Sequence, residues 1–564
     1  MPRRYGSDVV VEFLAAAGID HVALNPGASF RGLHDSLETA GTPAPIVALH
    51  EEVAVGIAHG YAKSAGRPMA VFLHDQVGLH HAAMALFNAW VDAVPILVIG
   101  GTGPRDVTKR RPWIDWIHSG NPEGAVIRDI VKWDVEPASL EALPEALARA
   151  LRVALTPPMG PVYVGVDALL QEADAAGIVA DAALALPAPP VAAPRAVVRD
   201  VADALAAARR PVVVVDRGAP GASVPLCELA ERVGLAVVDL GGRSFPAEHW
   251  ADQTAAWHEV LGEADLVLAL EMRDVTWGLT TVDLEDRGTQ PLTAPGARVI
   301  AVGLAELRDR GFLTTESFTP RIERITAEVT GFLADVVGEL GPAPAEDRRE
   351  RLAAAHDAQR RAAAEQAASA AAQCPIAPAH LAASLGRALA GQRWQLANGL
   401  LGGWPRRLWP MVDESSYLGR SGGEGLGYGL PASVGAALAQ RDGDRLVVDI
   451  QADGDLMYTP EALWTAAHHE LPLLIVVHNN RTYGKDELHQ DEVARARGRH
   501  GAPPPRGIRI EAPDIDFAGL ARAQGVAAVG PVEDPAELDD VLAEAVRTVT
   551  RERRPLLVDV VCAR

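Results

Sequence analysis

The sequence predicts an α/β fold of three consecutive doubly wound parallel-sheet domains. Three observations carry this prediction. The chain has 564 residues, which is more than a single hydrophobic core usually serves. Short apolar runs alternate with longer amphipathic stretches along most of the chain, a pattern typical of parallel sheets covered by helices on both faces. Two breaks in this pattern divide the chain into blocks of domain size.

The predicted domains are residues 1–180, 195–340 and 375–564. The first boundary is the segment 181–195, whose alanines and prolines show neither helix nor strand periodicity. The second boundary falls around residues 341–350. An alanine-rich stretch after it, 352–372, predicts a helix.

Each domain contains four apolar runs of strand length. In chain order these runs are residues 21–24, 46–49, 69–73, 95–99, then 211–215, 235–240, 265–270, 299–302, and finally 446–450, 473–477, 526–529 and 556–561. In open parallel sheets, ligands bind beyond the carboxyl ends of the strands. The residues that directly follow these runs are therefore the candidates for function.

Charge and hydropathy argue against two classes of partner. The chain carries 74 Asp and Glu against 52 Lys and Arg, a formal net charge of −22, so no basic surface for a nucleic acid is expected. No apolar run is long enough to cross a bilayer, and the first residues show no cleavable signal pattern. We therefore expect a cytoplasmic protein that binds neither nucleic acid nor membrane.

Polar residues follow two neighbouring strands of the third domain. Asp453 comes shortly after the run 446–450, and Asn480 after the run 473–477. Between them, Thr459 is a candidate cap and Pro460 a candidate first residue for a helix reaching about His469. A strand–helix–strand unit of this kind places Asp453 and Asn480 on the same edge of the sheet.

The residues at this edge suit a hard divalent cation and a diphosphate. Asp453, Asn480 and the backbone carbonyl of Thr482 offer oxygen ligands and leave places for diphosphate oxygens. Gly454 lets the chain approach the phosphates, whose charge the amides of Asp455 and Leu456 offset. The structural alternative is that Asp-Gly and Asn-Asn are common turn residues after strands.

A candidate acid lies in the first domain. The run 46–49 is followed by Glu51 and Glu52 at the start of a predicted helix. Apolar neighbours such as Leu49 and Val53 raise the pKa of a carboxyl and let it share a proton with a weakly basic ring nitrogen. Glu52 is the competing choice, although it points about 100° further round the helix. Glu51 as an ordinary helix-start carboxylate is the structural alternative.

The segment Asp453-Gly-Asp455, together with Asn479-Asn480, resembles the diphosphate motif of thiamine diphosphate (ThDP) enzymes, in which Gly-Asp-Gly precedes Asn-Asn. Ala452 departs from the first glycine of that motif. The resemblance implies ThDP and Mg²⁺ as cofactors, with Asp453 and Asn480 as metal ligands. It also implies a pyrimidine-binding first domain, a middle domain and a diphosphate-binding last domain.

The same resemblance gives Glu51 a role. A glutamate at this place in ThDP enzymes hydrogen-bonds N1′ of the aminopyrimidine and promotes the imino tautomer, whose N4′ removes the proton of thiazolium C2. The glycine-rich stretch 421–431 also resembles the family, which implies that Leu426 bends the cofactor and that the carbonyl of Glu424 accepts from the 4′-amino group. A glycine-rich turn before the predicted helix 432–439 is the alternative.

The first domain most resembles benzoylformate decarboxylases. Asn25-Pro26-Gly27 follows the first strand and His74 follows the third. This implies cofactor contacts at Asn25 and Pro26, with Asn398 as a further contact in the last domain. His74 is the leading acid/base candidate, with a structural hydrogen bond at the strand end as the alternative.

Three positions depart from benzoylformate decarboxylases. Ala28 stands where a serine holds the substrate carboxylate, and Ser29 follows one place later. Trp277 and Gly278 stand where a middle-domain histidine is expected, and glycine and leucine follow Asn398 where hydroxyl side chains are common. These departures argue against benzoylformate itself as the substrate.

For four tryptophans and three histidines the sequence leaves two interpretations of their position. The tryptophan pairs of the first and last domains either line a pocket or pack against the core or a second subunit, and packing is favoured. Three histidines near the candidate acid are undecided between the pocket and the solvent. The tryptophans are Trp113, Trp116, Trp404 and Trp409, and the histidines are His50, His80 and His81.

The resemblance implies a ThDP- and Mg²⁺-dependent carbon–carbon lyase or carboligase acting on a 2-oxo acid, with an aldehyde or ketone as a second substrate of ligation. The alternatives are acetolactate synthase-like ligation, with a flavin in the middle domain as an open point, and a non-catalytic ThDP-binding regulatory paralogue. Gly100-Gly-Thr-Gly103 is too short for a flavin fingerprint and lies in the wrong domain. Because such enzymes bind each cofactor between two subunits, a homodimer or homotetramer is expected.

Overall fold

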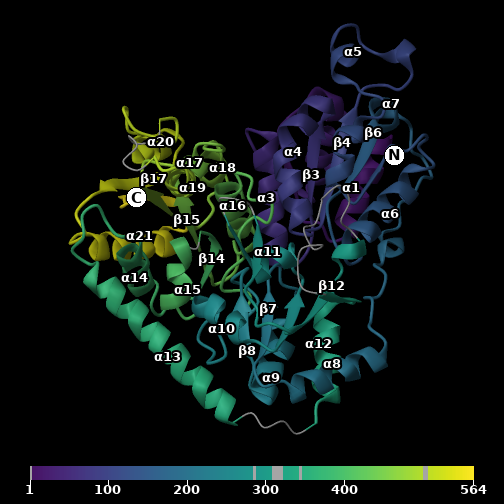
Figure 1. Ribbon diagram of the computed structural model, residues 1–564. Helices are drawn as coiled ribbons and strands as arrows, with labels where there is room; N and C mark the ends of the chain where they lie inside the picture. Colours follow the sequence, from purple (N-terminus) through teal and green to yellow (C-terminus); the bar gives the residue numbers. More distant parts are fainter. Residues whose placement is uncertain (1–2, 284–287, 308–321, 342–345, 400, 500–505) are drawn as a thin grey trace.

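Three parallel β-sheets with helices on both faces form three lobes in the computed structural model (Figure 1). The structure describes all residues except 1–2, 284–287, 308–321, 342–345, 400 and 500–505. The sheets lie within the three segments expected from the sequence, so the predicted α/β class is confirmed. We propose the predicted ranges as the domain limits.

The first sheet has the strand order β2-β1-β3-β4-β6-β5, and all its paired strands are parallel. Its strands are β1 (His21–Leu24), β2 (Ala44–Val47), β3 (Met69–His74), β4 (Ile96–Thr102), β5 (Trp133–Val135) and β6 (Val162–Asp167). The helices of this domain are α1 (Gly6–Ala16), α2 (Arg31–Ala40), α3 (Glu51–Ala65), α4 (Asp75–Val91), α5 (Ile114–His118), α6 (Leu143–Leu155) and α7 (Ala168–Glu172).

The middle sheet has the order β13-β12-β9-β7-β8 and is also parallel. Its strands are β7 (Pro211–Val215), β8 (Ala236–Asp239), β9 (Leu266–Leu270), β12 (Arg298–Gly303) and β13 (Ile322–Thr326). A separate antiparallel pair joins β10 (Thr280–Val282) to β11 (Thr289–Pro291). The helices are α8 (Arg195–Ala207), α9 (Ser223–Val233), α10 (Trp257–Glu263), α11 (Val275–Leu279) and α12 (Val329–Glu339).

The last sheet has the order β14-β15-β16-β18-β17. Its strands are β14 (Trp394–Asn398), β15 (Leu446–Ala452), β16 (Leu473–Asn479), β17 (Ala527–Val532) and β18 (Leu556–Val561). The helices are α14 (Pro378–Ala388), α15 (Trp404–Leu408), α16 (Gly429–Ala439), α17 (Asp453–Leu456), α18 (Ala462–His468), α19 (Gly484–Ala496), α20 (Phe517–Ala523) and α21 (Leu538–Glu552).

The alanine-rich stretch forms the long helix α13 (Glu346–Ser369), which runs along the outside of the molecule from the middle to the last domain (Figure 1). The segment before Arg195 is extended apart from one short 3₁₀ turn, as expected of a linker. None of the helices in the described part of the chain is both long enough and apolar enough to span a membrane.

Several sequence predictions of local structure need correction. Strands β5, β6, β13 and β14 were not among the predicted runs, and the predicted strand 46–49 ends at Val47. Thr459 does not cap a helix, because its hydroxyl donates to the carbonyl of Gly427 at 3.0 Å. The helix after it therefore begins only at Ala462.

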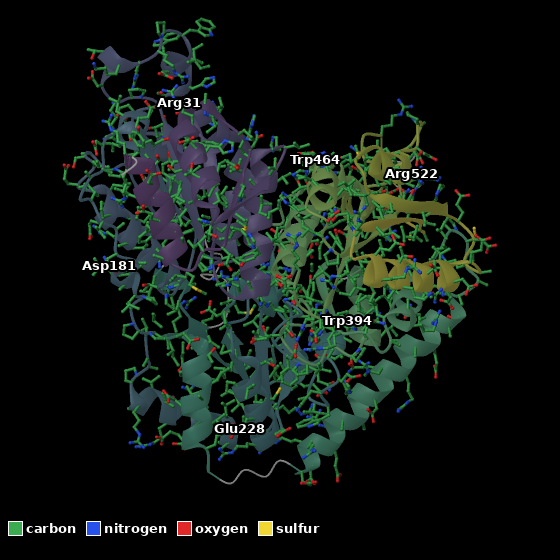
Figure 2. All side chains as sticks on the ribbon, turned by 180° about the vertical axis from the view of Figure 1, so that it is seen from behind. Arg31, Asp181, Glu228, Trp394, Trp464 and Arg522 are labelled. Atoms are coloured by element: carbon green, nitrogen blue, oxygen red, sulfur yellow. The ribbon has the colours of Figure 1, made fainter. Side chains whose placement is uncertain are left out.

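Close helix packing joins the first and last domains. A Cβ placed on Gly60 of α3 would come within 1.9 Å of the carbonyl oxygen of Ala432 in α16, so only glycine permits this approach. The largest hydrophobic core includes residues from both domains. Trp464 of α18 lies where these domains meet (Figure 2), and its neighbour Thr465 donates to the carbonyl of Val47 at 3.1 Å.

Candidate active site

The first half of the site lies at the carboxyl ends of neighbouring strands in the first sheet. Asn25 and Pro26 follow β1, Glu51 opens α3 after β2, and His74 is the last residue of β3. Because these strands are parallel neighbours, the four residues lie on one edge of the sheet. Asn25 is half-buried and Pro26 is exposed.

Glu51 is buried and bonded to a histidine. Glu51 is 5% exposed, and its Oε2 lies 3.1 Å from Nδ1 of His81. Gly78 of α4 leaves room for the carboxyl, since a Cβ there would lie 3.4 Å from Cγ of Glu51. The His50 ring stacks on His81 with the centroids 4.9 Å apart. The structure thus joins Glu51, His50 and His81, and the His81 side chain is itself exposed. His80 is exposed and has no part in this cluster.

Glu52 faces the last domain instead. A Cβ on Gly427 would lie 3.0 Å from its Oε1, and the carboxylates of Glu461 and Asp455 are close enough to act on it. Burial, followed by these two carboxylates, raises the pKa of Glu52 to about 7. The two adjacent glutamates therefore point to different partners, as the helical geometry predicts.

His74 is held between a hydroxyl and a second histidine. Its Nδ1 lies 2.8 Å from Oγ of Ser29, and its Nε2 lies 3.2 Å from Nδ1 of His118. Burial, and then the charge of His118, lowers the pKa of His74 below its ordinary value. The imidazole is therefore neutral near pH 7 and can accept or give a proton.

Ser29 does not take the place of the serine that benzoylformate decarboxylases have at the position of Ala28. It is buried and its hydroxyl is bonded to His74, while Ala28 is exposed. A Cβ on Gly27 would lie 2.5 Å from Cβ of His74, so the loop after β1 packs directly on this histidine. Ser29 orients the imidazole within the chain.

The second half of the site lies at the carboxyl ends of β15 and β16. Asp453 follows β15 and Asn480 follows β16, and the two strands pair in parallel. Oδ2 of Asp453 accepts from the amide of Arg481 at 2.6 Å, and Oδ1 of Asn480 accepts from the amide of Thr482 at 3.2 Å. The predicted metal ligands are thus brought into one hydrogen-bonded turn.

The residues between these strands serve both the turn and the core. A Cβ on Gly454 would meet the ring of Tyr483 at 2.6 Å, so the missing side chain makes room for this tyrosine. Leu456 is in the hydrophobic core, which leaves only its amide for a ligand. The carboxylate of Asp455 accepts from the amide of Gly427 at 2.7 Å and from Nε2 of Gln451 at 2.6 Å.

Asn398 lies at the end of β14 with its side chain turned into the sheet. Its Nδ2 donates to Oδ1 of Asp449 at 3.0 Å and to Oε1 of Gln451 at 3.2 Å. Burial raises the pKa of Asp449 to about 7, even though the bond from Asn398 lowers it. The amide nitrogen of Asn398 is therefore already committed to the sheet edge.

Two residues of the first domain hold the glycine-rich loop 421–427. Asn88 exchanges two hydrogen bonds of 3.2 Å with the backbone of Gly425. Lys63 donates to the carbonyl of Arg420 and to the hydroxyl of Tyr428, both at 3.1 Å, and so bridges the two ends of the loop. Sequence reasoning missed both residues, because neither lies at a strand end or in a motif.

The predicted functional residues of this loop face outward. Leu426 is 37% exposed and belongs to the exposed large apolar side chains. The carboxylate of Glu424 pairs with Arg420 at 2.9 Å and with Lys485 at 3.0 Å. Glu424 has a φ of 50°, in the left-handed region, which sets the turn before Leu426.

The donors of the second half-site fit a hard cation. Asp453 is 2% exposed, and burial raises the pKa of its carboxyl against the opposing effect of amide hydrogen bonds. No cationic side chain pairs with it in the described part of the chain, since Arg481 turns to Asp514 and Glu533. A buried carboxylate without a cationic partner is one that a divalent cation stabilises.

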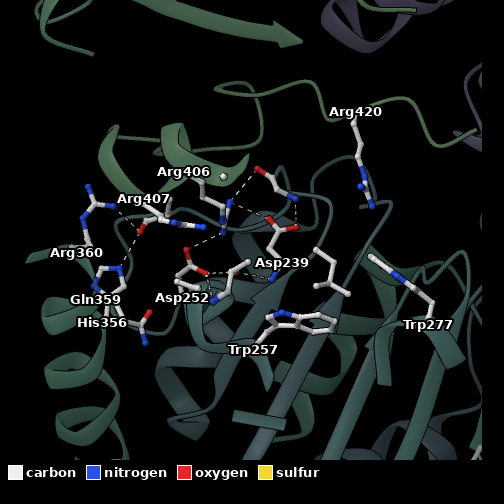
Figure 3. Close-up of a pocket in the computed structure, with 16 residues that line it drawn as sticks. Asp239, Asp252, Trp257, Trp277, His356, Gln359, Arg360, Arg406, Arg407 and Arg420 are labelled. Carbon is white, nitrogen blue, oxygen red and sulfur yellow. Dashed lines mark hydrogen bonds and ion pairs between the residues drawn. The ribbon is translucent and has the colours of Figure 1, made fainter. Parts of the chain in front are cut away.

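A separate cavity of about 300 Å³ lies between the middle and last domains (Figure 3). The buried Arg406 lines it and pairs with Asp252 at 3.1 Å and Asp239 at 3.4 Å. Trp257 and Trp277 line one side of it. None of the predicted ligands of ThDP or the metal lines this cavity, so it is not the predicted diphosphate site.

The tryptophan pairs behave differently from one another. Trp113 and Trp116 are each 72% exposed on a segment around α5 that projects from the first domain (Figure 1), so core packing is wrong for them. Trp409 is buried and its indole donates to the carbonyl of Ala382 at 2.8 Å. Trp404 is half-buried beneath the guanidinium of Arg407. Packing is confirmed only for Trp409.

Two family models match the chain at the two halves of this site. The N-terminal TPP-binding domain of thiamine pyrophosphate enzymes matches residues 4–120, and their C-terminal TPP-binding domain matches residues 397–560; thiamine pyrophosphate is another name for ThDP. The chain is a ThDP-dependent enzyme. It belongs to the superfamily that contains decarboxylases and carboligases.

The enzyme is similar to curated relatives over nearly its whole length. It is 28% identical to benzoylformate decarboxylase of Pseudomonas aeruginosa over 550 residues, which cover 91% of each chain. It is 29% identical to a protein of the same organism named probable 2-ketoarginine decarboxylase, over 94% of this chain and 89% of that one. It is 26% identical to the acetolactate synthase isozyme 3 large subunit of Escherichia coli, over 98% and 94%.

Solved structures of ThDP enzymes share its fold. A 4-hydroxybenzoylformate decarboxylase of Rhodococcus jostii superimposes with a TM-score of 0.78 at 24% identity, over 99% of both chains. A benzoylformate decarboxylase of Polynucleobacter necessarius gives a TM-score of 0.80 at 18% identity, also over 99% of both chains. At these identities the likeness concerns the three-domain fold.

Proposed function

We propose that this enzyme is a Mg²⁺-dependent 2-oxo acid decarboxylase or carboligase of the benzoylformate decarboxylase type. The observation that carries the proposal is the pair of half-sites at two sheet edges: a buried acid with histidines on one, and oxygen donors without a cationic partner on the other. Two of the similar proteins are named for the decarboxylation of 2-oxo acids, which supports the reaction class.

In this proposal the last domain holds the charged end of the cofactor. Asp453, Asn480 and the carbonyl of Thr482 ligate Mg²⁺, while the first-turn amides of Asp455 and Leu456 face the diphosphate. Leu426 would offer an apolar side chain to the cofactor. Asn398 holds the neighbouring strand end, and the backbone carbonyl of Glu424 accepts from the aminopyrimidine. Bound ThDP supplies a carbon nucleophile and an electron sink for the departing carboxyl group.

In this proposal, residues of the first domain hold and transfer protons. The Glu51 carboxyl holds a proton at the pyrimidine nitrogen N1′, and its bond to His81 fixes its orientation. His74 has a lowered pKa and gives or takes a proton at the oxygen of the substrate carbonyl. Asn25 and Pro26, on the same sheet edge, contact the cofactor ring.

Self-association as a homodimer or homotetramer is part of the proposal. Leu49 precedes the first half-site, and Leu426, Met457 and Tyr458 flank the second; all four are exposed apolar side chains. Exposed apolar side chains near a site favour coverage by a second surface. A second copy of the chain would bring a first-domain half-site to a last-domain half-site.

Two alternatives remain within the same superfamily. Similarity to acetolactate synthases favours ligation of two 2-oxo acids as the second candidate. A non-catalytic paralogue would have no need of a buried acid such as Glu51. The cytoplasmic location stays a prediction from the sequence, and the binding of a flavin stays an open point.

One assay tests the proposed function. The purified full-length enzyme is incubated with ThDP, Mg²⁺ and pyruvate, branched, aryl or guanidino 2-oxo acids, with and without aldehydes, and the products are read by mass spectrometry. The proposal predicts carbon dioxide and an aldehyde, or a 2-hydroxy ketone when an aldehyde is added. Acetolactate-type products alone would establish the second candidate. No product from any acid, despite calorimetric binding of ThDP, would contradict catalysis.

A further inference from the structure

Residues of all three domains enclose a small cavity beside the glycine-rich loop. Lys63 and Asp92 come from the first domain and Arg420 from the last, while the other charged residues of its lining follow strands of the middle sheet. The cavity has a volume of about 20 Å³. Such a volume holds a single water molecule or one monatomic ion, and it excludes phosphate or a carboxylic acid.

The cavity lies at the topological switch point of the middle sheet. In the order β13-β12-β9-β7-β8, the chain places β8 on one side of β7 and β9 on the other. Asp216 and Arg217 follow β7, and Arg273 follows β9, so both flanks of this crevice contribute to the lining. The crevice outside the carboxyl ends of strands at a switch point is where open α/β sheets bind ligands.

The charges around the cavity do not balance. Five cationic side chains and two carboxylates line it. Asp92 accepts from Lys63 at 2.7 Å, and Asp216 accepts from Nε of Arg273 at 2.8 Å. Two further carboxylates outside the lining compensate two more cations: Glu271 lies 3.6 Å from Arg217 and Glu424 lies 2.9 Å from Arg420.

Arg243 is the cation without a counterion. Within the described residues, its guanidinium has neither a hydrogen bond nor an ion pair. Its stem is fixed near Gly419, where a Cβ would lie 3.1 Å from Cδ of Arg243. Arg217, whose side chain is 7% exposed, also leaves its Nε without an acceptor, and so does Arg420. Buried donors without acceptors beside an uncompensated charge are costly.

We propose that this cavity binds one halide-sized anion, chloride under ordinary conditions, through the guanidinium groups of Arg243, Arg217 and Arg420. A water molecule satisfies the donors but leaves the charge uncompensated, whereas a monovalent anion does both. The cavity volume selects a monatomic ion over larger anions. The anion links three domains, and it lies next to Lys63, which holds the glycine-rich loop. This site is independent of the proposed reaction.

The lowered pKa of Lys63 agrees with an excess of positive charge around the cavity. Burial lowers the pKa of Lys63 to about 8 against the opposing effect of Asp92, and Arg243 adds to the lowering. An anion in the cavity would offset the contribution of Arg243. Asp92, His59, Arg273 and the hydroxyl of Tyr428 are the other groups that face Lys63 and belong to the same balance.

The first test compares salts at equal ionic strength. The midpoint of thermal unfolding of the full-length enzyme is measured in sodium chloride and in sodium gluconate, whose anion is too large for the cavity. We expect chloride to raise the midpoint by about 1 °C for each tenfold increase above its dissociation constant. Equal midpoints in the two salts over the whole range would overturn the proposal.

A variant of Arg243 should shift the unfolding midpoint in opposite directions in the two salts. Arg243→Gln removes both the uncompensated charge and the anion ligand, so it should raise the midpoint in gluconate, lower it in chloride, and abolish the chloride increment. The matched control Arg361→Gln, at an exposed position of α13, should keep the full increment. An undiminished chloride increment in Arg243→Gln would contradict the assignment of this residue.

A structural measurement keeps the proposal testable even when the variant fails to fold. Crystals of the wild-type enzyme grown in bromide should show one anomalous scatterer in the cavity, within hydrogen-bond reach of Arg217 and Arg243. The same crystals grown in gluconate should lack it. Ordered water in the cavity under both conditions would overturn the proposal.

Discussion

The two half-sites differ in how their charges are compensated. In the first domain, Glu51 is bonded to His81, and His74 lies between a hydroxyl and His118. In the last domain, Asp449 and Asp453 are buried and Asp455 is half-buried. None of the three pairs with a cationic side chain in the described residues, and burial raises the pKa of all three. In our proposal the first edge exchanges protons, whereas the second receives positive charge.

The largest effect is expected at Glu51. Glu51→Gln keeps the size of the side chain but cannot hold a proton at a ring nitrogen, so release of carbon dioxide should fall by about 10²- to 10⁴-fold at saturating ThDP and Mg²⁺. Glu52→Gln is the matched control and should keep most of the activity, because Glu52 faces Gly427 of the last domain. The reverse outcome would exchange the roles of the two glutamates.

A metal-linked loss is expected at Asp453. Asp453→Asn removes the charge that a divalent cation requires, and ThDP affinity in the presence of Mg²⁺ should fall by at least about 100-fold in calorimetric titrations. Asp514→Asn, an exposed neighbour that pairs with Arg481, should leave this affinity unchanged. Mg²⁺-dependent binding that survives in Asp453→Asn would show that the cation lies elsewhere.

A smaller loss is expected at Asn88, which positions the loop between the two half-sites. Asn88→Ala removes both hydrogen bonds to Gly425, so the free energy of unfolding should fall by about 1–3 kcal/mol, with a drop of about tenfold in kcat. Asn88→Asp keeps only the hydrogen bond from the amide of Gly425, so its stability and kcat should lie between those of the wild type and Asn88→Ala. Unchanged kinetics in Asn88→Ala would remove Asn88 from the list of positioning residues.

The smallest effect concerns Glu52 and pH. Its pKa is raised from 4.5 to about 7, chiefly by burial, so the folded protein loses stability as pH rises from about 4.5 to about 7. Glu52→Gln should therefore raise the free energy of unfolding at pH 8 by about 1–2 kcal/mol after allowance for solvent screening, and change it little at pH 4. Denaturant unfolding at both pH values measures this difference. Stabilisation of equal size at pH 4 would point to packing instead.

Much of the fold was readable in the sequence, because buried parallel strands are continuous apolar runs. The residues 211–215 and 556–561 coincide with β7 and β18. Strand β6 (Val162–Asp167) was not predicted although it is a buried, largely apolar run. Two other missed strands lack this signal: β13 (Ile322–Thr326) has two charged residues between its isoleucines, and β14 (Trp394–Asn398) carries polar residues at buried or half-buried positions. Their pairing is set by neighbouring strands rather than by their own composition.

The candidate site was predictable only where it follows strand ends. Asp453, Asn480 and Glu51 were found because parallel strands bring their carboxyl ends together. His81 was left undecided and Asn88 was not found, since their roles depend on which face of α4 meets Glu51 and Gly425. Lys63 depends on the close packing of α3 against the last domain. Contacts of this kind arise from tertiary packing, which no local pattern encodes.

We propose that the first-domain half-site of one subunit acts together with the last-domain half-site of another. Mixing two inactive variants tests whether the active site is shared in this way. Chains carrying Glu51→Gln are unfolded and refolded together with chains carrying Asp453→Asn, and the release of carbon dioxide is measured. A shared site leaves one intact site in each mixed dimer, so about a quarter of the wild-type activity should return on random association. A mixture no more active than either variant alone would contradict the claim.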